Sequence, residues 1–586
     1  MSRSSWSVLK TLLPYVWNNG WRLRLRLVTA VVLVFCGIAL NIITPLLFGY
    51  AVKSMSSQHV SVLVPLIIGG YGIFWTIGAV IVQVKDAIIF RVLERAVRRL
   101  SLDLFDHLHT LSLKFHLSIK TGAVLSAINR AQNALPELFW AMGLYVIPTV
   151  IELFSAGIVF GRLYGWTYAA MLVSASLAYC VYILLAVEKS TTYQRTFNDV
   201  HNKTSAWIVE SLSNFETVKY FSSHRYEHAL CDKLLENRER AASRRWIFSF
   251  VGVYGGGGLV MGISLFLFTL FLAYKVVWGD LDIGGFVAIH TYFTQSLDSL
   301  ANNFPYMVRK IREGFVDMEY VFDLMSISPE VIDRPMALPV VKKSPTIEFR
   351  NVSFAYEEQR KVLHDISFEL PAGQTLAIVG STGSGKSTIA RLLFRFYDVS
   401  SGAVFIDGED VRNIKQDSLR ASIGILPQDV TLFDMSIYDN IVYGHQDATE
   451  QDVENAVRFA HLKDFITSLP DGYQTMVGTR GLALSGGEKQ RIALARVFLK
   501  KPQIYIFDEP TSALDAYTQR EISHNLRVLS EDLTTLIIAH RLTTVAHADR
   551  IIVLDKGKIL EQGSHSQLLS QDGYYAFLWK QQQSEA

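Results

Sequence analysis

The stretch Gly380-Ser-Thr-Gly-Ser-Gly-Lys-Ser387 decides the fold of the C-terminal part of this chain. It follows an apolar strand pattern, Thr375-Leu-Ala-Ile-Val379, and precedes a helical run that starts at Thr388. Glycines let the loop turn its backbone N–H groups toward phosphate oxygens, and the helix N-terminus adds the positive end of its dipole. Lys386 is expected to reach the β- and γ-phosphates, and the Ser387 hydroxyl is expected to bind Mg²⁺. The pattern predicts an α/β P-loop domain whose ATP-binding residues are Gly380, Ser381, Thr382, Gly383, Ser384, Gly385, Lys386, Ser387 and Thr388.

The composition of the 586-residue chain is too apolar for an ordinary soluble enzyme. Half of the residues are hydrophobic, 19% are charged, and the mean hydropathy is +0.23. The net charge of +2, from 56 basic and 54 acidic residues, gives no reason to propose a nucleic-acid partner. The apolar residues gather in stretches of the roughly 20 residues needed to cross a bilayer. We expect spans at about 27–52, 61–84, 136–161, 165–187, 246–276 and 282–307.

The basic residues near the span ends predict the orientation in the membrane. Arg22, Arg24 and Arg26 precede the first span, and basic residues are numerous in the long stretches 85–135 and 188–245. Both termini and both long stretches are therefore expected in the cytoplasm. The short leader lacks the Arg- and Ser-rich pattern of a transit peptide, which favours a bacterial inner membrane over a mitochondrial inner membrane.

The two long cytoplasmic stretches show helical periodicity with few breakers. We expect helices that leave the membrane, return to it, and carry force to an ATPase; the alternative is that they only enlarge a dimer interface. Cys36, Cys180 and Cys231 form neither a disulfide framework nor a zinc pattern, and they are interpreted as packing residues.

A change in composition near 325–345 marks a domain boundary, with prolines at 329, 335 and 339. The predicted organisation is an α-helical polytopic membrane domain at 1–325, with six transmembrane helices and long cytoplasmic extensions. A linker at 326–345 and an α/β P-loop ATPase domain at 346–586 follow.

A second phosphate-related pattern is the apolar strand Gln503-Ile-Tyr-Ile-Phe that ends in Asp508 and Glu509. Asp508 at the strand tip is expected to hold Mg²⁺ through water. Glu509 is expected to polarise the attacking water as a general base. Two carboxylates about 120 residues beyond a phosphate loop are more specific than either alone.

The octet Leu484-Ser-Gly-Gly-Glu-Lys-Gln-Arg491 resembles the signature motif of ATP-binding cassette (ABC) proteins. The resemblance covers about 240 residues. It implies that Tyr356 stacks on adenine, that Gln428 acts in catalysis and at the metal, and that His540 contacts the γ-phosphate. In this family ATP lies between the phosphate loop of one domain and the signature of another, so one chain is half of a transporter that dimerises, with itself or with a different half. The further ATP-binding residues implied are Ser485, Gly486, Gly487 and Asp515.

One residue departs from that family. Exporters of this type usually carry Gly-Glu-Arg-Gly before the signature, whereas this chain has Gly478-Thr-Arg-Gly481. The missing carboxylate at Thr479 puts the coupling to the cytoplasmic arms in doubt, not ATP hydrolysis.

The membrane half resembles the mitochondrial Atm1 and heavy-metal-tolerance subgroup of type IV exporters. The similar segments are Leu111-Ser-Leu-Lys-Phe-His-Leu, Ile147-Pro-Thr-Val-Ile-Glu152, Asn214-Phe-Glu-Thr-Val-Lys-Tyr-Phe221, Thr291-Tyr-Phe-Thr-Gln295 and Val316-Asp-Met-Glu319. The resemblance implies export of glutathione-derived compounds, some of them carrying metal or sulfur.

The substrate residues are less well defined. Where the subgroup has Trp-Arg-Thr-x-x-Arg, this chain has Lys189-Ser-Thr-Thr-Tyr-Gln-Arg195, so positive charge is retained but displaced. Asn302, Asn303 and Arg309 are candidates to line a polar cavity, although Arg309 near the inner leaflet could instead extend to the interface.

The sequence therefore predicts a homodimeric, ATP- and Mg²⁺-dependent exporter of glutathione-derived compounds in a lipid bilayer. Two alternatives remain: a lipid or drug flippase of the same architecture, and a membrane-anchored ATP sensor that does not transport. The complete hydrolytic set of Asp508, Glu509 and His540 argues against the sensor.

Overall fold

The computed structural model describes residues 5–17, 20–56, 64–118, 121–340, 345–357, 360–478, 484–509, 521–522, 524–525, 533–539 and 542–585. The chain divides into two compact units. The first comprises residues 1–110 and 119–328, and the second comprises residues 111–118 and 329–586.

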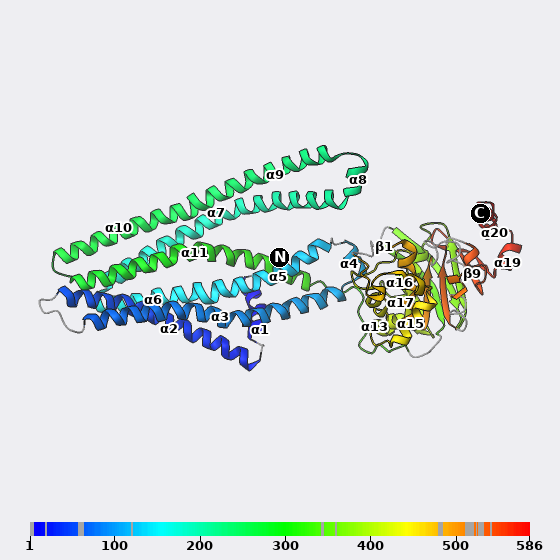
Figure 1. The fold of residues 1–586 in the computed structure, drawn as a ribbon, viewed down its shortest axis with the longest axis horizontal. Coiled ribbons are helices and arrows are strands. Elements are labelled where there is room, and N and C mark those ends of the chain that lie inside the picture. Colours follow the sequence, from blue (N-terminus) through cyan, green and yellow to red (C-terminus); the bar gives the residue numbers. More distant parts are fainter. Residues whose placement is uncertain are drawn as a thin grey trace. The chain divides into compact units, whose positions relative to one another are not determined.

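The first unit is entirely helical in its described residues (Figure 1). Its elements are α1 (Ser5–Trp17), α2 (Trp21–Ser56), α3 (Val64–Thr110), α5 (Thr121–Phe139), η1 (Trp140–Val146), α6 (Ile147–Tyr164), α7 (Trp166–Ser213), α8 (Phe215–Tyr220), α9 (His224–Ile247), η2 (Phe248–Gly255), α10 (Gly256–Val277) and α11 (Ile283–Met325). The η1 and η2 segments are π-helical and join their neighbours into continuous helical runs.

Five helical runs among the described residues are long and apolar enough to cross a membrane: Trp21–Met55, Val64–Thr110, Ala127–Tyr164, Trp166–Ser213 and His224–Val277. They overlap the first five expected spans, of which residues 61–63 of the second lie outside the described residues. The sixth expected span lies in α11, which carries polar residues such as Asp298 and Asn302 and does not reach the same hydropathy. α11 is instead the helix with the most buried positions in this unit, because several other helices pack around it.

Small residues let α11 pack closely against α2. A Cβ atom at Gly49 would lie 2.5 Å from the Cβ of Ala288, and one at Gly284 would lie 2.4 Å from the Cβ of Lys53. Such close backbone approach is the usual way in which helices associate in membranes. At the start of α11, Asp282 caps the helix by accepting a hydrogen bond from the Gly285 backbone N–H at 2.7 Å.

The two stretches that are expected in the cytoplasm form long helices, as the sequence predicts. α7 has 48 residues, about 70 Å at ~1.5 Å per residue, whereas the hydrocarbon core of a bilayer is ~30 Å thick. α7 and α9 run side by side and are joined through α8, as Figure 1 shows. Thr204 on α7 is buried against α9 and donates a hydrogen bond to the Leu234 carbonyl at 3.4 Å.

The second unit contains two β-sheets. A four-stranded antiparallel sheet has the order β2-β1-β4-β5, and a six-stranded sheet has the order β10-β9-β3-β8-β7-β6. In the larger sheet only β10 is antiparallel to its neighbour. The strands are β1 (Ile347–Glu357), β2 (Arg360–Leu370), β3 (Thr375–Gly380), β4 (Ser401–Ile406), β5 (Glu409–Asp410), β6 (Ile423–Leu426), β7 (Ile504–Asp508), β8 (Thr534–Ile538), β9 (Arg550–Asp555) and β10 (Lys558–Gly563).

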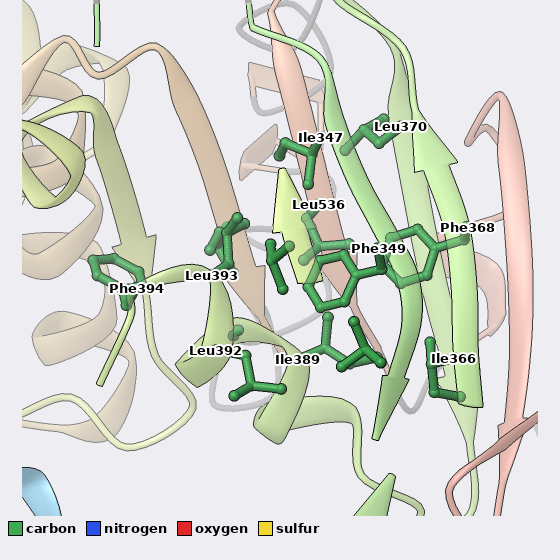
Figure 2. Close-up of a cluster of buried hydrophobic side chains, with 14 of the residues drawn as sticks. Ile347, Phe349, Ile366, Phe368, Leu370, Ile389, Leu392, Leu393, Phe394 and Leu536 are labelled. Atoms are coloured by element: carbon green, nitrogen blue, oxygen red, sulfur yellow. The ribbon is translucent and has the colours of Figure 1, made fainter. Parts of the chain in front are cut away.

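Helices complete this unit and enclose its two main cores. They are α4 (Leu113–Ser118), α12 (Lys386–Leu393), α13 (Gln416–Ser422), α14 (Ile437–Val442), α15 (Glu450–Phe459), α16 (Lys463–Ser468), α17 (Gly486–Lys500), α19 (His565–Ser570) and α20 (Tyr574–Glu585). Figure 2 shows the core at α12, where Ile389 and Leu393 meet Phe349 and Phe368 of the smaller sheet. The two phenylalanine rings stack at 4.6 Å between centroids.

Part of the expected linker packs on the second unit. Arg395 is 2% exposed, and its guanidinium donates hydrogen bonds to the Ile332 carbonyl at 3.2 Å and to the Ile414 carbonyl at 3.3 Å. It also forms an ion pair with Asp333 at 3.4 Å. Residues 329–340 are therefore fixed against the sheet domain rather than suspended between domains.

Candidate nucleotide site and membrane cavity

The phosphate loop and the carboxylates meet because their strands are neighbours in one parallel sheet. β8 lies between β3 and β7, and Ile538 of β8 is opposite both Ile378 of β3 and Asp508 of β7. The carboxyl ends of all three strands thus reach the same edge of the sheet, where open α/β sheets bind ligands. A cavity of about 1060 Å³ opens there.

Two glycines give the phosphate loop its path. Gly380 has a φ of 152°, and a Cβ there would lie 1.9 Å from the Leu554 carbonyl oxygen. Gly385 has a φ of 106°, and a Cβ there would lie 2.7 Å from the Leu363 side chain. Any other residue would be strained at these positions, so the loop requires glycine at both.

Lys386 is the first residue of α12 and is buried beneath the loop. Its ammonium group donates hydrogen bonds to the Gly380 and Ser381 carbonyls, both at 2.9 Å. Burial lowers the pKa of Lys386, while Glu509 and Asp508 act in the opposite direction. The lysine is thus held at the mouth of the loop, within reach of a bound phosphate.

The expected magnesium ligands are adjacent. The Ser387 hydroxyl donates a hydrogen bond to Asp508 Oδ2 at 3.2 Å. Hydroxyl and carboxylate oxygens are the ligands that Mg²⁺ prefers. In the loop itself, the Ser384 hydroxyl is buried and has no hydrogen-bond partner among the described residues. The pair of oxygens from Ser387 and Asp508, at the wall of the cavity, fits a site for Mg²⁺.

Glu509 is fixed from three directions. Its backbone adopts a φ of 53°, unusual for a residue with a side chain, and its N–H donates to the Ile538 carbonyl at 2.9 Å. Gln428 Nε2 donates to its carboxylate at 3.1 Å, and Gln490 Nε2 donates to its backbone carbonyl at 3.1 Å. Strained backbone of this kind persists where the surrounding structure over-determines it. The carboxylate that we assign as the base is therefore held over the cavity.

Tyr356 lines the same cavity on the side of β1. Its ring packs edge-on against Phe354 and Tyr397, at 4.9 and 5.2 Å between centroids. Its hydroxyl lies 3.2 Å from the Thr388 hydroxyl and accepts a hydrogen bond from Arg391 at 3.1 Å. These contacts fix the ring at the wall of the cavity.

The signature lies apart from this cavity. Ser485 caps α17, accepting a hydrogen bond from the Glu488 N–H at 3.3 Å, while its own N–H donates to the Glu488 carboxylate at 2.7 Å. Of the described residues, neither Ser485 nor Gly486 or Gly487 lines the nucleotide cavity. Thr479, Asp515 and His540 lie outside the described residues.

A second cavity, the membrane-unit cavity, lies within the helical unit and has a volume of about 660 Å³. It is lined from α1, α5, α7, η2 and α11, and most of its polar side chains are arginines, carboxylates and amides. These polar lining residues are Arg130, Gln194, Arg195, Asn198, Arg309, Arg312, Glu313, Asp317 and Glu319, together with Ser190, Thr191, Ser249 and Tyr254.

Known proteins share both the sequence and the architecture. Residues 27–300 match the family described as ABC transporter transmembrane region, and residues 363–512 match ABC transporter. A solved structure of a bacterial Atm1-family ABC exporter with ATP bound is 38% identical, with a TM-score of 0.88, and covers 96% of this chain and 98% of its own. The chain is an ABC exporter of the Atm1 family.

Curated relatives of this Atm1-family exporter agree. The ATM1-type heavy metal exporter of Novosphingobium aromaticivorans is 38% identical over 99% of this chain and 96% of its own length. The mitochondrial iron-sulfur clusters transporter atm1 of Neurospora crassa is 36% identical over 99% of this chain and 83% of its own length. The predicted fold class, subgroup and ATP-hydrolysing export are thereby confirmed.

The exporter's five expected substrate residues do not lie together. Arg195 and Arg309 line the membrane-unit cavity. Lys189 is instead placed over the Phe248 ring at 5.6 Å, and Asn302 is exposed outside the lining. Asn303 lines a separate small pocket, where its amide donates to the Ser299 carbonyl at 3.3 Å.

The sequence alone did not point to several residues at the two sites. Arg391 lies one helical turn after Thr388 in α12 and contacts Tyr356, and this spacing of three residues was an available signal. Gln194 and Asn198 line the cavity together with the expected Arg195, since Asn198 lies four residues after Gln194 and three after Arg195 on α7. Arg130 and Arg312 come from distant helices, and only packing brings them to the cavity.

Proposed function

We propose that the chain works as a homodimer that uses ATP and Mg²⁺ to export glutathione-derived organic anions. The observation that carries the proposal is the membrane-unit cavity, whose polar lining is rich in guanidinium and amide groups that suit carboxylates. The relatives named for heavy metals and iron-sulfur clusters support metal- or sulfur-bearing forms of these compounds as cargo. The described lining contains arginine, amide, hydroxyl and carboxylate groups, which suit an organic anion better than a bare soft metal ion.

The dimer is supported by the separation of the two halves of the ATP site. Each chain has one phosphate loop and one signature, and the described signature residues do not line the chain's own nucleotide cavity. The tip of the α7–α9 arm also exposes a group of aromatic side chains: Phe215, Tyr220 and Phe221 are 56%, 77% and 76% exposed. Exposed apolar groups that cluster in this way mark interaction surfaces.

ATP bound at the cavity supplies the phosphoanhydride bond that drives transport. Lys386 would bind the β- and γ-phosphates, and Ser387 and Asp508 would hold Mg²⁺, which would neutralise phosphate charge. Glu509, held by Gln428, accepts a proton from the attacking water at its carboxylate. We propose the same nucleotide-binding, signature and catalytic residues that the sequence predicts, including Asp515 and His540, and a site of action in a bacterial inner membrane with both termini in the cytoplasm. The alternative location is the mitochondrial inner membrane.

The test is ATP-dependent uptake of labelled glutathione disulfide into inside-out proteoliposomes, with Glu509→Gln as the matched control. We expect uptake that requires ATP, and a fall in turnover of about 10²–10⁴-fold in the Gln variant. If wild-type protein takes up none of this substrate while lipids or hydrophobic amines stimulate its ATPase, the glutathione proposal is wrong and the flippase alternative replaces it.

A further inference from the structure

Arg245 lies in the last turn of α9, directly before the π-helical segment η2 that lines the membrane-unit cavity. Its guanidinium carbon lies 4.1 Å from the centre of the Phe197 ring on α7. One of its N–H groups donates to Gln194 Oε1 at 3.3 Å. Gln194 lines the cavity, so Arg245 stands immediately behind a lining side chain.

Arg245 is held by an aromatic ring and an amide, and no carboxylate takes part in these contacts. Among the described residues, no Asp or Glu forms an ion pair with it. By contrast, Arg130 pairs with Asp317 at 3.1 Å, and Lys310 pairs with Glu137 at 2.6 Å. An aromatic face and a neutral amide hold the guanidinium in place without neutralising its charge.

Two arginines of the lining are similarly short of anionic partners. Arg195 on α7 forms no ion pair or hydrogen bond among the described residues. Arg309 on α11 approaches Glu313 only at 3.9 Å, and its buried Nε has no hydrogen-bond partner there. Two helices thus bring guanidinium groups with unused donors to the cavity wall, and α9 places a third, Arg245, directly behind that wall. Four arginines and three carboxylates line the cavity, and Arg245 behind Gln194 adds further positive charge.

We propose that Arg245 is a specificity-determining residue of this cavity, which binds a carboxylate of the transported anion while Gln194 orients its guanidinium. The planar guanidinium has five N–H donors, of which one is used by Gln194, and its geometry matches a carboxylate with two parallel hydrogen bonds. The proposal rests on export of an organic anion as proposed above, and it names the residue that selects for the charge.

The experiment compares wild type with Arg245→Gln, Arg245→Lys and the control Arg244→Gln. Arg244 is the exposed neighbour on the same helix, so its substitution removes the same charge from the same turn without touching Gln194 or Phe197. Each protein is tested for ATP-dependent uptake of glutathione disulfide and of its tetraethyl ester, which keeps the amino groups but has no carboxylate. Anisotropy titration with carboxyfluorescein, an organic anion unrelated to glutathione, is the second measurement.

We expect Arg245→Gln to raise the KM for glutathione disulfide about tenfold, the effect of one lost charge-assisted hydrogen-bonding group, with kcat changed less than about twofold. Arg245→Lys should recover most of the loss, Arg244→Gln should match wild type, and the KM for the ester should be the same in all four proteins. A purely structural role would instead change the ester and the disulfide equally.

The two proposals fail in different ways. If wild type transports no glutathione disulfide but binds carboxyfluorescein, and Arg245→Gln alone weakens that binding, the proposed cargo is wrong and the role of Arg245 stands. If Arg245→Gln and Arg244→Gln behave alike toward both anions, or if wild type binds neither anion, the proposal for Arg245 is overturned.

Discussion

At the scale of single residues, the phosphate loop depends on backbone conformations that only glycine adopts without strain. Gly380 combines a left-handed backbone with a Cβ position that the Leu554 carbonyl already occupies. The glycines of this stretch predicted a phosphate-binding loop. The contact with β9, in contrast, follows from the order of strands in the sheet, which no local pattern reveals.

Gly380→Ala should lower the free energy of unfolding of the protein by about 2–4 kcal/mol and abolish nucleotide binding, because strain and a backbone clash add together. Gly408→Ala is the matched control, since its φ of 79° is also left-handed but its Cβ would meet nothing within 4 Å. That variant should lose only about 1 kcal/mol. Chemical denaturation followed by tryptophan fluorescence measures both, and equal losses would show that the contact with Leu554 is unimportant.

We expect ATP binding to depend on pH because of Lys386. Burial lowers the pKa of the free lysine below its usual 10.5, and a bound phosphate raises the pKa again by stabilising the charged form. ATP binding therefore takes up a proton. The affinity for ATP is highest below the pKa of the free lysine, and it weakens as the pH rises through that pKa, by at most about tenfold per pH unit. Titration with a fluorescent ATP analogue between pH 7 and 10 measures this.

Lys386→Arg provides the control for that titration, because an arginine stays charged throughout this range. Its affinity, even if weaker overall, should not change with pH. A parallel decline in both proteins would assign the pH effect to another group.

At the scale of elements, the sequence predicted helices from apolar periodicity and strands from short apolar runs, and these have the predicted types. It did not predict which helix faces meet. Arg245 and Gln194 are separated by 51 residues and become neighbours only because α7 and α9 pack side by side. For the same reason Lys189, which lies between the cavity-lining residues Val187 and Ser190 of α7, contacts Phe248 instead of the cavity.

The short helix α8 at the end of the α7–α9 pair should transmit force to a cassette. Tyr220→Ala combined with Phe221→Ala should lower transport at least about tenfold, with the free energy of unfolding changed by no more than ~0.5 kcal/mol, because both side chains are exposed. Tyr226→Ala, an exposed aromatic on the adjoining turn of α9, serves as the control. Transport by the double variant equal to that of the control would contradict the role of the tip.

At the scale of the whole molecule, one chain supplies half of each proposed ATP site. Lys386→Ala disables the phosphate loop, and Ser485→Arg disables the signature. Neither variant alone should trap nucleotide with vanadate, but dimers that contain one copy of each have one site with both intact parts. Co-expression should therefore restore trapping. If the mixed dimers remain inactive while each variant alone stays folded and dimeric, the shared-site arrangement is wrong.

The membership of residues 111–118 in the second unit has an evolutionary consequence. Leu113 packs against the core between the two sheets, and Lys114 pairs with Glu330 at 3.7 Å, although these residues lie more than 200 positions before that unit's main segment. A cassette inherited or transplanted without this segment would lose an apolar partner. Recombination between relatives should thus be tolerated best when residues 111–118 and the cassette come from the same parent. These two stretches of sequence should therefore change together over time.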